Sequence, residues 1–104
     1  MFGLVVRFTC KDEASARAFD ELVAATIEQI KVQEPGTLVY ASHRVDGEPL
    51  VRVFYELYRD RAAFDAHEEQ EHTKHFLSSR GLYVASYEVD WLSLLAGKGT
   101  AAKR

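Results

Sequence analysis

The chain has 104 residues, 47% hydrophobic and 28% charged, which fits one compact globular domain. Its net charge of −3, with acidic and basic residues interspersed, disfavours nucleic acid as a partner, because such a surface needs a clustered basic patch. The single Cys10 excludes an internal disulfide, no apolar run approaches the roughly 20 residues that span a bilayer, and the start lacks signal-peptide features, so we expect a soluble, cytoplasmic protein.

The first third of the chain predicts a strand followed by a long helix. Residues 3–9, GLVVRFT, are rich in β-formers and apolar on both faces, as in a covered central strand. From Lys11 to Gln33 the apolar residues recur with helical spacing, with Asp12 or Thr9 as a possible cap. Glu34-Pro35-Gly36 ends this helix, because Pro35 disfavours helical geometry at Glu34 and Gly36 permits a sharp turn.

Three more strands are expected. Residues 37–44 and 50–58 form a hairpin around Asp46-Gly47, a typical turn pair. In the second of these strands, one face is wholly apolar, whereas the other mixes apolar residues with Glu56 and Tyr58. Residues 82–92 read as the last strand, and residues 96–104 as a flexible tail that follows a single domain of residues 1–95.

Residues 59–77, RDRAAFDAHEEQEHTKHFL, predict a helix that is broken in the middle. Asp60 is a suitable N-cap, and the polar run at residues 68–71 favours a bend or a break. Helical spacing then places four side chains on the inner side of the broken helix: Phe64, His67, His72 and Phe76.

The order strand, helix, strand, strand, helix, strand predicts an α+β fold. It is the ferredoxin-like βαββαβ plan, an antiparallel four-stranded sheet with the helices on one face. The helices can cover only one face, yet the strand at residues 50–58 is apolar on both. Because an uncovered apolar sheet marks an interface, we expect a homodimer that packs sheet against sheet.

Several of these segments together resemble the antibiotic biosynthesis monooxygenase (ABM) family. They are Glu34-Pro35-Gly36 before a strand, Glu56-Leu57-Tyr58 at the end of another, the run from Asp60 to His67, and then His72 and Phe76. The resemblance extends from Gly3 to Trp91 and implies a dimeric α+β barrel. It also implies a range of activities, among them oxygen insertion into electron-rich aromatic compounds without metal or flavin.

His67 and His72 match the helix histidines of that family. A histidine titrates near neutrality, so either residue could move a proton from a phenol or to a peroxide, or could instead only bond the joint of the broken helix. Glu56 would lie in a largely apolar pocket, where a carboxylate is either paired, with Arg52 or a helix histidine, or has a raised pKa. We therefore take His67, His72 and Glu56 as the candidate catalytic residues.

Aromatic side chains are the candidates for contact with a planar substrate, although the core is the commoner role for any single one of them. The candidate substrate-binding residues are Tyr40, Phe54, Tyr58, Phe64, Phe76 and Trp91. A metal site built from His67, His72, His75 and Glu71 is the weaker alternative, because His67 and His72 lie about 140° apart on a regular helix. We assign no metal and no cofactor.

The preferred hypothesis is a cofactor-independent monooxygenase acting on a small phenol, hydroquinone or polyketide-like aromatic compound. Two alternatives stay open. One is an isomerase or other proton-transfer enzyme that acts on a small carbonyl compound with the same residues. The other is a dimeric module that binds a small ligand without catalysis. A panel of hydroquinones in an oxygen-uptake assay would separate the first reading from the others.

Overall fold

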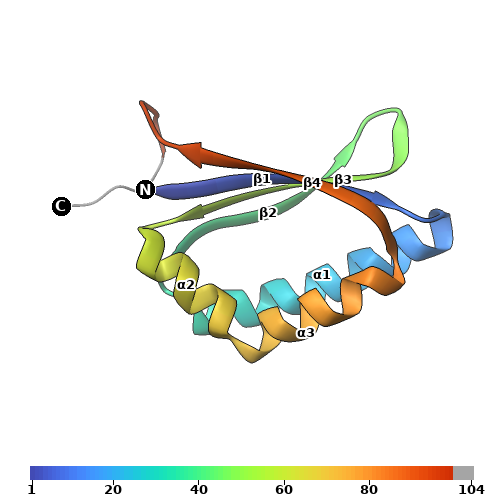
Figure 1. The fold of residues 1–104 in the computed structure, drawn as a ribbon, viewed down its shortest axis with the longest axis horizontal. Coiled ribbons are helices and arrows are strands. Elements are labelled where there is room, and N and C mark those ends of the chain that lie inside the picture. Colours follow the sequence, from blue (N-terminus) through green and yellow to red (C-terminus); the bar gives the residue numbers. More distant parts are fainter. Residues whose placement is uncertain (100–104) are drawn as a thin grey trace.

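The computed structural model describes residues 1–99. It contains a single antiparallel sheet with all helices on one side (Figure 1). The sheet order is β2-β3-β1-β4, so the predicted ferredoxin-like α+β fold is confirmed. In chain order the elements are β1 (Phe2–Cys10), α1 (Glu13–Gln33), β2 (Thr37–Val45), β3 (Glu48–Tyr58), α2 (Arg61–Glu69), α3 (Glu71–Ser79), the 3-10 turn η1 (Arg80–Leu82) and β4 (Val84–Ser93).

Local signals place most element ends where the sequence predicts them. Asp12 caps α1 by accepting from the Ser15 N–H at 2.7 Å, and Asp60 caps α2 by accepting from the Ala63 N–H at 2.8 Å. The expected break falls at Gln70, whose extended backbone (φ −70°, ψ 144°) separates α2 from α3. The hairpin turns at Gly47, which has a φ of 81°.

The start of the last strand differs from the prediction. Residues Arg80–Leu82 form η1, and β4 begins only at Val84. The Tyr83 N–H donates to the Arg80 carbonyl at 2.9 Å, and the Tyr83 carbonyl accepts from the Lys11 N–H at 2.9 Å. These two bonds hold the chain in a turn that carries it from α3 to the sheet before strand pairing starts.

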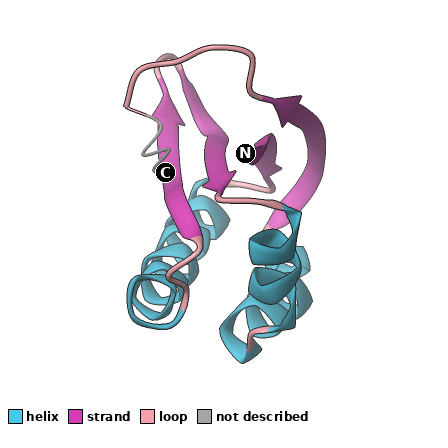
Figure 2. Ribbon diagram, turned by 90° about the vertical axis from the view of Figure 1, so that its left-hand side faces the viewer, coloured by secondary structure: helices cyan, strands magenta, loops and turns pink. Residues whose placement is uncertain are grey.

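Figure 2 shows the sheet and the helices as two layers. The buried core consists of side chains from both layers. Phe54 lies at its centre, fully buried, with its ring centroid 4.7 Å from that of Phe8 and 5.9 Å from that of Phe19. The predicted facing of β3 is confirmed, because Phe54, Glu56 and Tyr58 are all buried on the helix side. Packing of these rings stabilises the sheet against α1.

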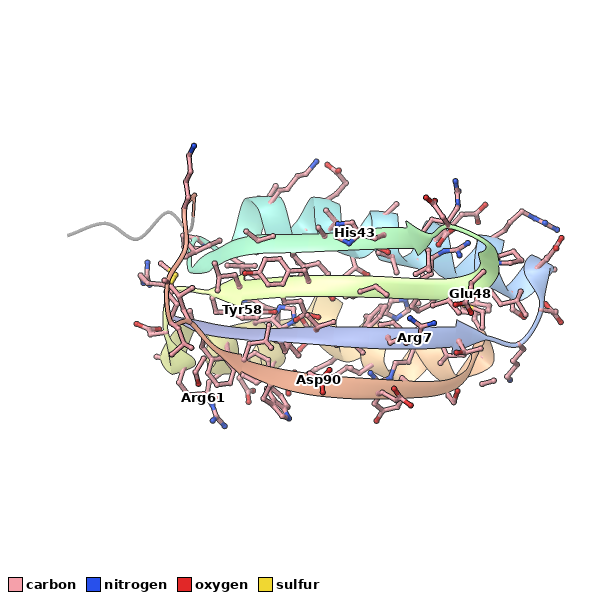
Figure 3. All side chains as sticks on the ribbon, turned by 90° about the horizontal axis from the view of Figure 1, so that it is seen from above. Arg7, His43, Glu48, Tyr58, Arg61 and Asp90 are labelled. Atoms are coloured by element: carbon pink, nitrogen blue, oxygen red, sulfur yellow. The ribbon has the colours of Figure 1, made fainter. Side chains whose placement is uncertain are left out.

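The opposite face of the sheet carries no helix of the described residues (Figures 1 and 3). Val5, Val53 and Tyr55 are half-buried there, and Arg7 binds Glu48 across it at 3.2 Å. Within residues 1–99, no helix is long and apolar enough to cross a membrane. Residues 100–104 of the expected tail lie outside the described residues.

Gly36 is needed for close packing and not for left-handed backbone geometry. The positive-φ glycines of the described chain are Gly47 and Gly99, so the turn after Pro35 does not need the conformational freedom that we expected Gly36 to supply. A Cβ at position 36 would lie 2.7 Å from the Cβ of Ala63, too close for two carbon atoms. The first turn of α2 therefore rests directly on the start of β2.

We expect Gly36→Ala to lower the free energy of unfolding by about 1–3 kcal/mol, because the new methyl group forces these two elements apart. Urea denaturation measures the change. Gly81→Ala is the matched control, since a Cβ there meets nothing within 4 Å, and it should stay within about 0.5 kcal/mol of wild type. Equal effects of the two substitutions would contradict the packing argument.

Candidate active site

A cavity of about 300 Å³ lies between the sheet and the α2–α3 pair. Leu4, Val6 and Phe8 of β1 and the facing side chains of β4 form its roof, and Glu56 and Tyr40 close its inner end. The lining is mainly apolar and aromatic, with few polar groups, which is the usual character of a small-molecule site. Its lining residues are Leu4, Val6, Phe8, Tyr40, Glu56, Phe64, His67, Glu68, Thr73, Phe76, Leu77, Arg80, Tyr87, Val89 and Trp91.

The Glu34 carboxylate joins three elements beside this cavity. Oε1 accepts from Thr37 Oγ1 at 2.6 Å and lies 2.8 Å from His67 Nδ1, and Oε2 accepts from His72 Nε2. The side chain is only 4% exposed. Burial by itself would raise the pKa of Glu34, but the hydrogen bonds from His67, Thr37 and His72 outweigh burial and hold that pKa below its usual value.

This arrangement fixes the orientation of His67. Its Nδ1 atom faces Glu34, with the hydroxyl of Thr73 at 3.3 Å, while the ring itself lines the cavity. Nε2 is therefore the ring nitrogen that remains for a bound molecule. A carboxylate on one imidazole nitrogen sets the tautomer and stabilises the charged ring after the other nitrogen accepts a proton.

Glu56 lies at the inner end of the cavity and is hydrogen-bonded to a neighbour on its own strand. The Tyr58 hydroxyl donates to Glu56 Oε1 at 2.7 Å. Of the alternatives for Glu56, pairing with Arg52 is wrong, because Arg52 binds Asp20 of α1 through two bonds of 2.8 and 3.0 Å. Burial raises the pKa of Glu56, and the bond from Tyr58 only partly offsets this, which agrees with the alternative of a raised pKa.

Comparison with known proteins decides the family. Residues 1–78 match the family profile described as antibiotic biosynthesis monooxygenase. The chain belongs to the ABM family. No curated protein matches the chain in sequence.

Solved structures with the ABM fold are similar over nearly the whole chain. A candidate antibiotic biosynthesis monooxygenase from Caulobacter crescentus is 25% identical, with a TM-score of 0.84 over 91% of this chain and 90% of its own. A protein of Shewanella oneidensis is also 25% identical, with a TM-score of 0.78 over 88% of this chain and 87% of its own. A candidate ABM protein from Nitrosomonas europaea, at 24% identity and a TM-score of 0.83 over 92% and 100% of the two chains, shows the fold alone.

The ABM fold brings only part of the predicted site to the cavity. His67, Glu56, Tyr40, Phe64, Phe76 and Trp91 line it. Trp91 is 61% exposed and lies at the open side of the cavity. Phe54 and Tyr58 are instead fully buried in the core, and His72 bonds Glu34 outside the lining. No cluster of three or more potential metal ligands occurs within residues 1–99.

Glu34 was not predicted as a site residue, because it was interpreted only as the end of a helix and as part of the segment that resembles the ABM family. One signal was present in the sequence. A negative charge at the C-terminus of a helix is unfavourable with the helix dipole, so a glutamate there is a candidate for pairing with a cation or a donor elsewhere. Arg80 and Tyr87 were also missed, because no element was assigned to residues 78–81 and Tyr87 was considered only as part of the last strand.

The raised pKa of Glu56 predicts a pH-dependent stability difference for Glu56→Gln. Ionisation of the buried carboxyl disfavours folding, so its stabilising contribution is present below its unfolded pKa and is lost as pH rises through its folded pKa. The glutamine stays neutral and still accepts from Tyr58. We expect the stability that the variant gains over wild type, measured by urea denaturation, to grow as pH rises above about 4, the usual pKa of a glutamate. A difference that is independent of pH would contradict the assignment.

Proposed function

We propose that this protein is a cofactor-independent monooxygenase in which His67 removes a proton from an electron-rich aromatic substrate. The observation that carries the proposal is the hydrogen bond between Glu34 and His67 Nδ1, which leaves Nε2 as the other ring nitrogen of a side chain that lines the cavity. Membership of the ABM family supports the same chemistry. A positioned general base of this type contributes about 10²–10⁴-fold to rate.

The proposed reaction balances without an external reductant. His67 takes a proton from an acidic ring C–H or a hydroxyl, and the resulting carbanion or phenolate gives one electron to dioxygen. Recombination of the two radicals forms a carbon–oxygen bond and a peroxide. Return of the proton from His67 to the outer oxygen, with loss of a second hydrogen from the carbon, releases water and leaves a carbonyl on the ring.

The surrounding residues supply the other needs of this chemistry. Phe64 and Trp91, whose ring centroids are 5.7 Å apart in an edge-to-face arrangement, give a planar substrate an aromatic wall at the cavity. The apolar roof limits access of water to the anion and the peroxide. Tyr40 lies at the inner end, with its ring centroid 5.5 Å from that of His67, where its hydroxyl can donate to a developing oxyanion.

Oxygen uptake with a panel of hydroquinones, naphthols and anthrones tests the proposal. We expect uptake with at least one compound in the absence of added metal or flavin, with incorporation of one labelled oxygen atom from dioxygen into the product. Turnover of a substrate at an unchanged rate under nitrogen would overturn the oxygenase assignment and favour the isomerase reading. Saturable binding without any turnover would favour the ligand-binding module.

We also propose that the protein forms a homodimer in which the open faces of the two sheets pack together. We propose the cytoplasm as its location. Val5 pairs with Tyr55 across adjacent strands, and Val53 lies two residues from Tyr55 on the same face of β3, opposite Phe54 and Glu56. A stable homodimer buries about 1,200–2,000 Å² or more, which requires most of one sheet face.

Analytical sedimentation, which measures the oligomeric state, tests this prediction. Wild type should be a dimer at micromolar concentration, and Tyr55→Arg should be a monomer, because it places a charge at the centre of an apolar contact. Arg17→Glu, an exposed position on α1, is the control and should leave the dimer intact. A monomeric wild type would contradict the proposal.

A further inference from the structure

Arg80 is a charged group at the cavity that the proposed chemistry does not use. It lies in η1, between α3 and β4, and is half-buried with its side chain on the cavity lining. Its guanidinium carbon lies 4.5 Å from the centroid of the Tyr87 ring, which holds the planar group in one orientation. Within residues 1–99, the guanidinium makes no ion pair with an acidic side chain.

The other charged groups at the cavity differ from Arg80. Glu56 is bonded to Tyr58, and His67 is bonded to Glu34. Glu68 also lines the cavity but is exposed, so water screens its charge. Burial, Glu56 and Glu34 raise the pKa of the Tyr40 hydroxyl well above its usual value. The positive charge of Arg80 acts in the opposite direction.

The register of the sheet places Arg80 away from the proposed base. Leu4 pairs with both Glu56 and Trp91, so these residues lie in one row across the sheet. Tyr87 pairs with Phe8 and is four residues from Trp91 along β4, which corresponds to about 13 Å. The cavity therefore has an acid–base end in the row of Glu56 and a cationic end beside Tyr87, where Arg80 stacks, and these two positions lie about 13 Å apart along β4.

We propose that the cavity selects a fused-ring hydroxyaromatic carboxylate, whose carboxylate pairs with Arg80 while its hydroxyl faces His67. A stacked guanidinium presents its N–H groups as a fork that matches a carboxylate, and such charged hydrogen bonds are stronger than neutral ones. That the hydroxyl faces His67 rests on the proposed function, in which His67 is the base. The preference for an anion is independent of turnover.

Equilibrium binding tests the preference with a matched pair of probes. We take 6-hydroxy-2-naphthoate, which carries both groups at opposite ends of two rings, and its neutral amide, each titrated by fluorescence. Wild type should bind the acid about tenfold more tightly than the amide. Arg80→Met keeps the apolar stem and should remove this difference, while Arg17→Met, an exposed charge on α1, should leave it unchanged.

Glu68→Gln provides a second test, in which binding of the acid should become stronger and not weaker. Removal of this exposed negative charge should strengthen binding of the acid by a factor of about two and leave the amide unchanged. Equal binding of acid and amide by wild type, an equal loss of both with Arg80→Met, or no binding of either probe at millimolar concentration would each overturn the proposal. Oxygen uptake with neutral naphthols would persist in the first two cases, so failure of the specificity is distinct from failure of the proposed function.

Discussion

Glu34→Ala is expected to lower the free energy of unfolding by about 3–5 kcal/mol, because it leaves buried partners without their acceptor. His67 Nδ1, His72 Nε2 and Thr37 Oγ1 all bond this one carboxylate, which is 4% exposed. A domain of this size has about 5–15 kcal/mol of stability, so the loss is a large fraction of the whole. The midpoint temperature of thermal unfolding should fall by on the order of 15 °C.

Two further variants show whether the carboxylate itself is responsible. Glu34→Gln keeps the shape and one acceptor, and we expect it to cost about 1–3 kcal/mol. Glu28→Ala removes an exposed carboxylate from α1, the helix that Glu34 caps. This carboxylate is bonded to Lys31 at 3.0 Å, and its loss should change stability by less than about 0.5 kcal/mol. If Glu34→Ala lowered the free energy of unfolding no more than Glu28→Ala, the hydrogen bonds from His67, His72 and Thr37 to Glu34 would not exist in solution.

His67→Gln is expected to lower kcat by about 10²–10⁴-fold with a substrate from the oxygen-uptake panel, because glutamine cannot accept the proton. Its amide can still bond Glu34, so the fold should persist, and circular dichroism checks this. KM should change less than kcat, since the side chain acts on the transition state more than on ground-state binding.

His72→Gln and His75→Gln complete that series. His72 bonds the other oxygen of Glu34 but does not line the cavity, so we expect a smaller loss, through the position of His67. His75 is exposed and should have no effect. If His72→Gln lost about 10²–10⁴-fold in kcat while His67→Gln kept most of its activity, the two histidines would have to exchange roles.

The elements that local chemistry determines were predictable from the sequence. Asp60 followed by Arg61-Ala62-Ala63 identified the start of α2, and the polar run after His67 identified the break before α3. The alternation along β3 identified its helix-facing side, which placed Glu56 in the cavity and Val53 on the open face. Each of these inferences needed only residues within one or two turns or one strand.

The contacts that build the site were not predictable in the same way. Glu34 and His67 are 33 positions apart in the chain, and only the packing of the α1 end against α2 brings them together. The bond from Tyr58 to Glu56 depends on side-chain direction at the end of a strand, which alternation alone does not determine. The close approach of Gly36 to Ala63 likewise exists only in three dimensions.

The tautomer of His67 tests the central claim most directly, and it needs no substrate. Nitrogen-15 NMR at about pH 8, where an ordinary imidazole is neutral, distinguishes the two ring nitrogens. We predict a proton on Nδ1, held by Glu34, and an unprotonated Nε2 at the cavity, with the Nδ1 signal lost in Glu34→Ala. A proton on Nε2, or a His67 spectrum that does not change when Glu34 is replaced, would contradict the account.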